Sequence, residues 1–293
     1  MRLNFRSVLK FRIMKKILLP TDFSDISMNA INYAISLYAK VPAEFYFLNV
    51  YRVPYLTNEE LMENDVQQLA VVESELSVAS QNALIETIQK VEKADIHKFH
   101  RISDYNFLIS SVKNIVSDKD IDLIVMGTKG ATGTKEIFLG SNTGDVLMKT
   151  DCNVIAVPEE SDFKEIEEIV FPTDFKIKYE LDTLKPLISL ARLNNSKIRI
   201  LHLSDSYLLD QDKESNKRVL ESYFEEIEHS YHTLSNIDFE EALNCFIQSR
   251  GNVDMIAIIA GHYNFFQRLF FRPKVMELSF HSKVPLFVLH QVK

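Results

Sequence analysis

Residues 127–144 read GTKGATGTKEIFLGSNTG and contain five of the 7 glycines in a chain of 293 residues. Glycine loses more conformational freedom on folding than other residues, so this concentration indicates positive φ angles or a close approach to the backbone. The stretch follows an apolar run at 122–126 and precedes an expected helix that begins at Ser141. Peptide N–H groups of such a loop and of the next helical turn can bind an anion such as phosphate. The alternative is a long loop in which glycine only permits tight turning.

On both sides of this stretch, short apolar runs alternate with segments of helical periodicity. We expect strands at 17–19, 44–50, 98–102, 122–126 and 154–157. Helices are expected at 24–39, 58–92, 105–118 and 141–148. Alternating strands and helices predict a doubly wound α/β unit with a parallel sheet of five strands and helices on both faces.

The same pattern then begins again. Pro20, Thr21 and Asp22 recur 152 positions later, in the stretch IVFPTDF at 169–175. Toward the C-terminus the spacing is 132, which pairs Asp254 with Asp122. We attribute the difference to a shorter helix in the second half, at about 214–229. The chain therefore reads as a tandem duplication, with an extension at 1–13, domains at 14–158 and 167–293, and an acidic linker at 159–166.

Composition narrows the class of protein. The chain is 46% hydrophobic and 25% charged, as in ordinary globular proteins. A net charge of −8 argues against a nucleic-acid partner, and no apolar run approaches the roughly 20 residues of a membrane helix. Cys152 and Cys245 form no disulfide framework, so we expect two buried thiols and a cytoplasmic location. The basic residues of 1–13 indicate either an amphipathic arm or an extension upstream of Met14.

These motifs resemble those of the universal stress proteins. Gly127, Gly130, Gly140 and Ser141 fit the Gly-x2-Gly-x9-Gly-Ser/Thr pattern of the ATP-binding members of that family. The resemblance implies a sheet order of 3-2-1-4-5 in each half, with nucleotide in the crevice at the carboxyl ends of the strands. It also implies that the last strands, 154–157 and 286–289, pair antiparallel in an internal pseudo-dimer. Further association into a homodimer, and protein partners that the sequence does not identify, are additional expectations.

By the same resemblance the ligand is ATP, with Mg²⁺ carried by its phosphates. Asp22 would lie near adenine and ribose, backbone groups at Val50 would read the adenine edge, and the glycine loop would hold the phosphates. The implied binding residues are Pro20, Thr21, Asp22, Val50, Met126, Gly127, Gly130, Gly140, Ser141, Asn142 and Thr143. Two alternatives concern single residues: Asp22 as a turn residue that caps a helix, and Met126 as part of the sheet core.

The second half departs from the motif. The 132-residue spacing places Ile259, His262, Arg272 and Pro273 where the first half has Gly127, Gly130, Gly140 and Ser141. Proline has no N–H to donate at a helix start, and isoleucine rarely adopts positive φ. We therefore expect the second half not to bind ATP as the first half would.

No catalytic or metal-ligand constellation is evident in the sequence. Hydrolysis needs a positioned base and a metal clamp, so we expect a nucleotide-binding stress or signalling module with at most slow ATPase activity. The alternative is a nucleotide- or flavin-dependent enzyme of a related α/β fold. An adenylating enzyme would need a glycine-serine loop after the first strand, where this chain has PTDFS at 20–24.

Overall fold

The computed structural model describes residues 15–52, 66–91, 95–128, 140–204, 210–235, 237, 239–260 and 284–291. Elements of the first half are β1 (Lys15–Pro20), α1 (Asp25–Leu37), β2 (Ala43–Tyr51), α3 (Val66–Lys90), β3 (Lys98–Tyr105), α4 (Leu108–Lys119), β4 (Leu123–Gly127), α5 (Ser141–Lys149) and β5 (Val154–Val157). Those of the second half are β6 (Glu168–Thr173), α6 (Leu181–Asn194), β7 (Lys197–Ser204), α7 (Gln211–Tyr223), β8 (His229–Ser235), α8 (Phe239–Arg250), β9 (Met255–Ile259) and β10 (Leu286–Leu289).

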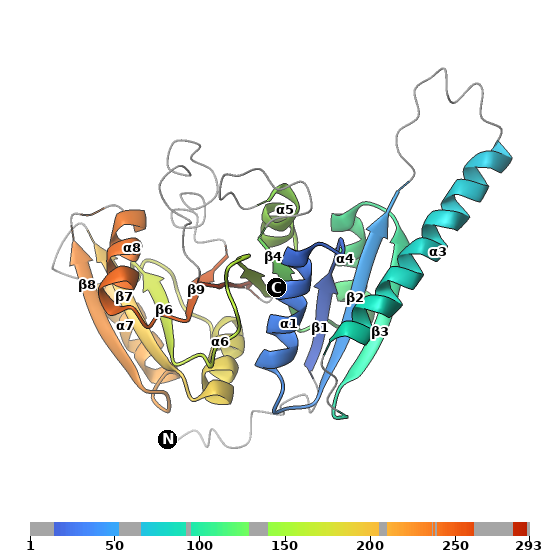
Figure 1. Cartoon of the computed structure of the whole chain (residues 1–293). Helices are drawn as coiled ribbons and strands as arrows, with labels where there is room; N and C mark the ends of the chain where they lie inside the picture. Colours follow the sequence, from blue (N-terminus) through green and yellow to red (C-terminus); the bar gives the residue numbers. More distant parts are fainter. Residues whose placement is uncertain are drawn as a thin grey trace, which may run out of the picture.

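All the described strands belong to one sheet, in the order β3-β2-β1-β4-β5-β10-β9-β6-β7-β8. Within each half the strands are parallel and follow the order 3-2-1-4-5, so the predicted topology is confirmed twice. β5 and β10 pair antiparallel, with Phe287 directly opposite Ile155, as the family resemblance implied. Figure 1 shows the two halves side by side around this seam.

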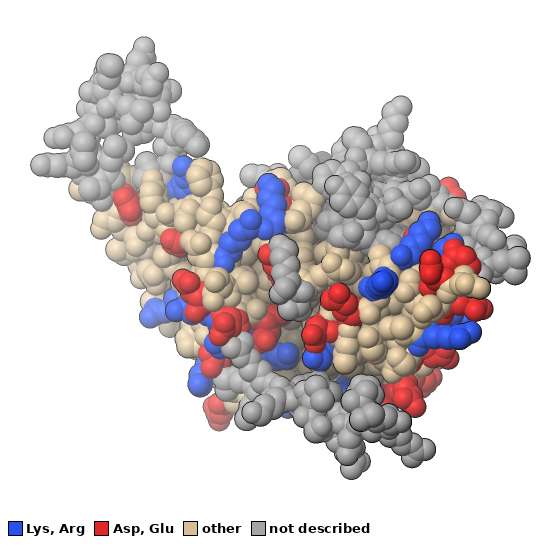
Figure 2. Space-filling model, turned by 180° about the vertical axis from the view of Figure 1, so that it is seen from behind, with Lys and Arg blue, Asp and Glu red and all other residues tan. Residues whose placement is uncertain are grey.

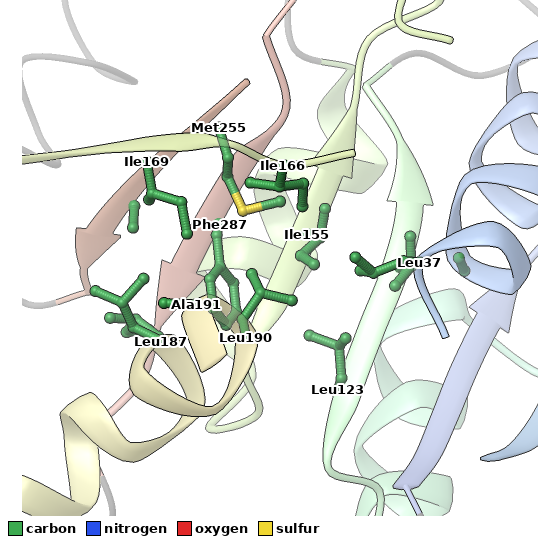
Figure 3. Packing of buried hydrophobic residues seen from close by; sticks show 14 of the residues in the cluster. Leu37, Leu123, Ile155, Ile166, Ile169, Leu187, Leu190, Ala191, Met255 and Phe287 are labelled. Carbon is green, nitrogen blue, oxygen red and sulfur yellow. The ribbon is translucent and has the colours of Figure 1, made fainter. Parts of the chain in front are cut away.

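Two hydrophobic layers cover the two faces of the sheet. One layer packs under α1, α3, α6 and α7, and the other packs under α4, α5 and α8. Each layer contains buried residues of both halves, so the core runs through the seam without interruption. Figure 3 shows Ile155 of the first half and Phe287 of the second within the same cluster.

Polar contacts repeat at the two spacings found in the sequence. Asp122 Oδ2 accepts a hydrogen bond from Lys16 N at 2.9 Å, and Asp254 Oδ2 accepts one from Glu168 N at 3.0 Å. In the same way, the carbonyl before β5 accepts from Ile124 N at 2.9 Å, and the carbonyl before β10 accepts from Ile256 N at 3.0 Å. The two halves are thus built alike down to single hydrogen bonds.

Several predicted boundaries were wrong. The second-half helix ends at Tyr223, and the residues that we expected to complete it lead into strand β8, which begins at His229. Phe224 and Ile227 are buried after the helix end, which turns the chain back toward the sheet. In the first half, β3 continues to Tyr105, where we expected a helix to begin.

The segment predicted as a linker packs against the first half. Asn29 Nδ2 donates hydrogen bonds to the carbonyl oxygens of Pro158 and Ser161, both at 3.1 Å. Ile166, the last residue of the segment, is fully buried. The connection between the halves is therefore held along α1 and is part of the packed structure.

Two further observations concern a possible membrane span and the surface charge. Among the described residues, no helix has both the length and the apolar character required to cross a bilayer. On the face shown in Figure 2, lysine and arginine are interspersed with aspartate and glutamate and do not gather in one basic patch.

Candidate functional site

The predicted site residues that the structure describes lie where strand order reverses. β1 lies between β2 and β4 in the sheet, and ligands of doubly wound folds bind beyond the carboxyl ends of strands at such a point. The turn after β1, the end of β2, the end of β4 and the start of α5 all lie at this edge. Gly130, which we predicted as a phosphate ligand, lies outside the described residues.

The turn after β1 is held by its own side chains. Phe23 adopts a left-handed conformation with φ of 66°, and its N–H donates to Thr21 Oγ1 at 3.0 Å. Asp22 Oδ1 accepts from Ser24 N at 3.1 Å and from Ser24 Oγ at 2.6 Å. Ser24 in turn caps α1 by accepting from the N–H of Ser27. Asp22 is therefore a turn residue, as the alternative interpretation held, but the residue that caps the helix is Ser24. Asp22 is also exposed at the edge.

A buried chain of hydrogen bonds fixes the end of β2. Asn49 Nδ2 donates to the carbonyl oxygen of Thr21 at 2.8 Å, and Asn49 Oδ1 accepts from Ser80 Oγ at 2.8 Å. Ser103 Oγ continues the chain to Ser80 at 2.7 Å. These bonds place the half-buried Val50 at the edge, next to the turn. Asn49 was not predicted from the sequence, although a single asparagine in the apolar run FYFLNV was the available signal.

Gly127 is required by packing within the protein. A β-carbon at this position would lie 2.6 Å from Ile26 Cγ2 and 3.1 Å from the Ile26 carbonyl oxygen. Among the described glycines only Gly251 has positive φ, so the expectation of a left-handed glycine is not met at Gly127. The close approach is made by α1. Met126 is buried in the sheet, which confirms its interpretation as a core residue.

The start of α5 is anchored to the end of β4, and its first turn is exposed. Thr143 is buried, and its hydroxyl donates to the carbonyl oxygen of Gly127 at 2.7 Å. Gly140 N donates to Thr128 O at 2.6 Å. Ser141 and Asn142 are exposed. The N–H groups of the first helical turn have no carbonyl partner within the helix and carry the positive end of its dipole, so this turn can bind an anion.

The described residues contain no cluster of potential metal ligands and two cysteines that differ in burial. No group of three or more histidine, cysteine or acidic side chains that could hold a metal ion occurs among the described residues. Cys152 is buried, and this burial, together with the nearby Asp122 carboxylate, raises the pKa of its thiol to about 12. Cys245 is exposed, so our expectation that both thiols are buried was wrong for this one.

The second half forms the same turn but fills the space beside it. Phe175 has φ of 57°, and its N–H donates to Thr173 Oγ1 at 3.1 Å. Phe175 is only 1% exposed, and its ring stacks on His202, with 4.5 Å between ring centroids. His202 Nδ1 lies 3.2 Å from the carbonyl oxygen of Thr173, in the place where Asn49 bonds to Thr21. Asp174, which corresponds to Asp22, is buried.

In the second half, α6 starts later after the turn than α1 does in the first half, and this leaves room for Ile259. The register of β9 beside β6 places Ile259 where β4 has Gly127, and Ile259 is buried. α6 begins at Leu181, six residues after Phe175, whereas α1 begins two residues after Phe23. The earlier start of α1 brings Ile26 against the strand end, and glycine is the residue that fits beneath it.

These features define a doubly wound α/β protein with an exposed strand-end edge in its first half. Residues 14–158 match the model of the universal stress protein family. The chain is 32% identical over 148 residues to universal stress protein MJ0531 of Methanocaldococcus jannaschii, covering 50% of this chain and 82% of that protein. It is 28% identical over 162 residues to MJ0577 of the same organism, covering 49% and 94%. The chain belongs to the universal stress protein family.

A solved structure matches both halves together. The crystal structure of a universal stress protein from Archaeoglobus fulgidus DSM 4304 covers 94% of this chain and is itself covered to 96%, with a TM-score of 0.66. Its sequence identity is 20%, so the likeness shows the fold.

Proposed function

We propose that the first half binds an adenine nucleotide, ATP, and that the protein acts as a nucleotide-responsive stress or signalling module. One observation supports this most directly. The strand-end edge of the first half presents Asp22 and the first turn of α5 to solvent, whereas the second half buries Asp174 and covers the same edge with Phe175. A ligand can therefore reach this edge in the first half, and the side chains of the second half already occupy it.

In this proposal the residues divide into those that contact the nucleotide and those that position them. Asp22 and the backbone at Val50 contact ribose and adenine, and the N–H groups of Ser141 and Asn142 contact phosphate oxygens. The positioning residues are Pro20, Thr21, Met126, Gly127, Gly140 and Thr143. Gly130, which lies outside the described residues, supplies a further phosphate contact in this proposal. Mg²⁺ arrives with the phosphates, which commonly bind it together with few protein ligands.

Hydrolysis needs a positioned base and a metal clamp. This proposal assigns neither to the site, so hydrolysis is expected to be slow. We place the protein in the cytoplasm because neither cysteine needs an oxidising compartment. We also propose that 14–158 and 167–293 are two domains of the same family, and that the second has lost the nucleotide site. Association of the whole chain into a homodimer is a separate proposal, which sedimentation would test.

The test copies the second half into the first. The double variant Gly140→Arg, Ser141→Pro introduces the residues at 272 and 273. We expect wild-type protein to release ATP or ADP on denaturing extraction and to bind MgATP in calorimetry, and the variant to lose both. Because proline is tolerated at the first position of a helix, the variant should remain folded.

Gln211→Pro makes the same kind of change at the first residue of α7, far from the site, and should leave nucleotide binding unchanged. A double variant that bound MgATP as tightly as wild type would refute the site. Extraction that released a flavin in place of an adenine nucleotide would favour the enzyme alternative.

A further inference from the structure

The second half is preceded by a segment that binds along α1 of the first half. We call residues 161–166 the second-half lead-in. Phe163 packs edge-on against Tyr33, with 5.3 Å between ring centroids. Glu165 Oε1 accepts a hydrogen bond from Lys40 Nζ at 2.9 Å. At its end, Ile166 is fully buried, and its carbonyl oxygen accepts from Ser196 Oγ.

The residues before β1 repeat the pattern of this lead-in. At the 152-residue spacing, LKFRIM at 9–14 corresponds to SDFKEI at 161–166. Phe11 corresponds to Phe163, Ile13 to Glu165 and Met14 to Ile166. We call residues 9–14 the first-half lead-in. The two sequences share an aromatic residue at the third position and an apolar residue at the sixth.

α6 offers a groove where α1 carries the second-half lead-in. Buried positions of α1 recur in α6 at a spacing of 153, as Ala30, Ile31, Ala34 and Ile35 become Thr183, Leu184, Leu187 and Ile188. At this spacing Pro186 corresponds to Tyr33, and Leu193 corresponds to Lys40. Both Pro186 and Leu193 line a cavity of about 300 Å³ between α6 and the end of α1.

The cavity lies over the seam, and Lys15 lines it as well. Its floor includes Ile155 and Phe287, which pair across β5 and β10. Figure 3 shows both side chains with Leu190 of α6 and Leu123 of β4. The first-half lead-in ends at the residue next to Lys15, and it alternates apolar residues with Lys10 and Arg12. Phe11 and Ile13 are within reach, because an extended chain spans about 3.3–3.6 Å per residue.

We propose that the first-half lead-in binds in this groove on α6, as the second-half lead-in binds on α1. Each half is then held by the segment that precedes the other. On each helix, the residue that faces the lead-in matches the lead-in residue in character. Where the second-half lead-in has the Lys40–Glu165 ion pair, the corresponding residues Leu193 and Ile13 are both apolar. Phe11 takes the place of Phe163 and packs against Pro186, and Met14 takes the place of the buried Ile166.

The chain contains no tryptophan, so one introduced tryptophan reports directly on its surroundings. We expect Phe11→Trp to emit at shorter wavelength than Phe5→Trp and to be quenched less by acrylamide, because residue 5 precedes the lead-in. Adding Leu193→Asp to the Phe11→Trp protein should move its emission toward that of Phe5→Trp. Lys185→Ala, on α6 but outside the cavity lining, should not change the emission.

Three results would overturn the proposal. Equal quenching of Phe11→Trp and Phe5→Trp would show that the lead-in is not bound. Shielding that appears only as protein concentration rises would show binding to a second copy. The third result concerns a hydrophobic dye in wild-type protein and in a chain that begins at Met14. Equal dye binding by both proteins would show a groove open to small molecules, whereas we expect the dye to bind only the shortened chain.

Discussion

The turns after β1 and β6 have one backbone and two different environments. Phe23 and Phe175 share a left-handed φ, and each donates its N–H to a threonine hydroxyl two residues earlier. Phe23 is 38% exposed, whereas Phe175 is 1% exposed and its ring stacks on His202. The PTDF motif therefore builds the turn in both halves, and the covering side chains determine whether the edge is open.

At the opposite edge, where these strands begin, the two halves differ in charge. β6 begins with Glu168, whose buried carboxylate accepts from Arg250 Nε at 3.0 Å and also pairs with Arg199. β1 has Lys16 at the corresponding position, and its ammonium group donates to the carbonyl oxygen of Lys119 at 2.7 Å. One half thus depends on a buried ion pair at a position where the other has a partly exposed lysine.

The largest effect expected from this difference is that of Glu168→Gln. Removing one partner of a buried ion pair leaves uncompensated charge and costs about 3–5 kcal/mol. Burial alone would raise the pKa of Glu168, but its hydrogen bonds and ion pairs with Arg199 and Arg250 lower it from 4.5 to about 2. The ionised carboxylate therefore stabilises the fold above about pH 4.5, and this contribution is lost as pH falls toward 2.

Urea unfolding at several pH values checks this prediction. The difference in unfolding free energy between wild type and Glu168→Gln should be largest near neutrality and should shrink as pH falls. Lys16→Gln is the matched control in the first half, and it should cost less than about 1 kcal/mol because a partly exposed pair contributes little. Equal costs for the two variants would remove the distinction between the halves.

A smaller effect is expected for Gly127→Ala. The added methyl group would lie 2.6 Å from Ile26 Cγ2, and overpacking of this kind costs about 1–3 kcal/mol. Thermal unfolding should show this loss, and Ile26→Ala in the Gly127→Ala background should restore part of it. If Gly127→Ala were as stable as wild type, packing would not explain the glycine.

The smallest effect is expected at the first turn of α1. Ser24 accepts from the N–H of Ser27, whereas Glu180 makes no side-chain cap bond at the start of α6. Ser24→Ala should cost about 1 kcal/mol, measured by chemical denaturation. The corresponding change Glu180→Ala should be close to neutral. A loss of stability at Glu180 as large as that at Ser24 would argue against a capping role.

Much of the fold could be predicted because it depends on local pattern. The apolar runs at 154–157 and 286–289 matched β5 and β10 without adjustment. The recurrence of PTDF located the second half, and the family resemblance supplied the strand order that both halves show. The end of α7 could not be predicted in this way, because β8 is a half-exposed strand of polar sequence, HSYHTLS, that lacks a buried-strand signal.

The site was predicted less completely, because the contacts that shape it join residues far apart in the sequence. Gly127 appeared in a glycine-rich stretch and suggested a ligand, yet the group that excludes a side chain there is Ile26, 101 residues earlier. Asn49 and Ser80 were missed because their bonds join β2 to α3. The binding roles of Asp22, Ser141 and Asn142 stay predictions until a nucleotide is identified.

Because β5 and β10 pair within one chain, an amino-acid substitution can alter one half without altering the other. When two identical subunits meet across a two-fold axis, every substitution occurs on both sides of the contact. Here both strands belong to one polypeptide, so a substitution occurs once, and the junction is an intramolecular contact that dilution does not weaken. One half could therefore close its strand-end edge with Phe175 and His202 while its neighbour left the same edge open.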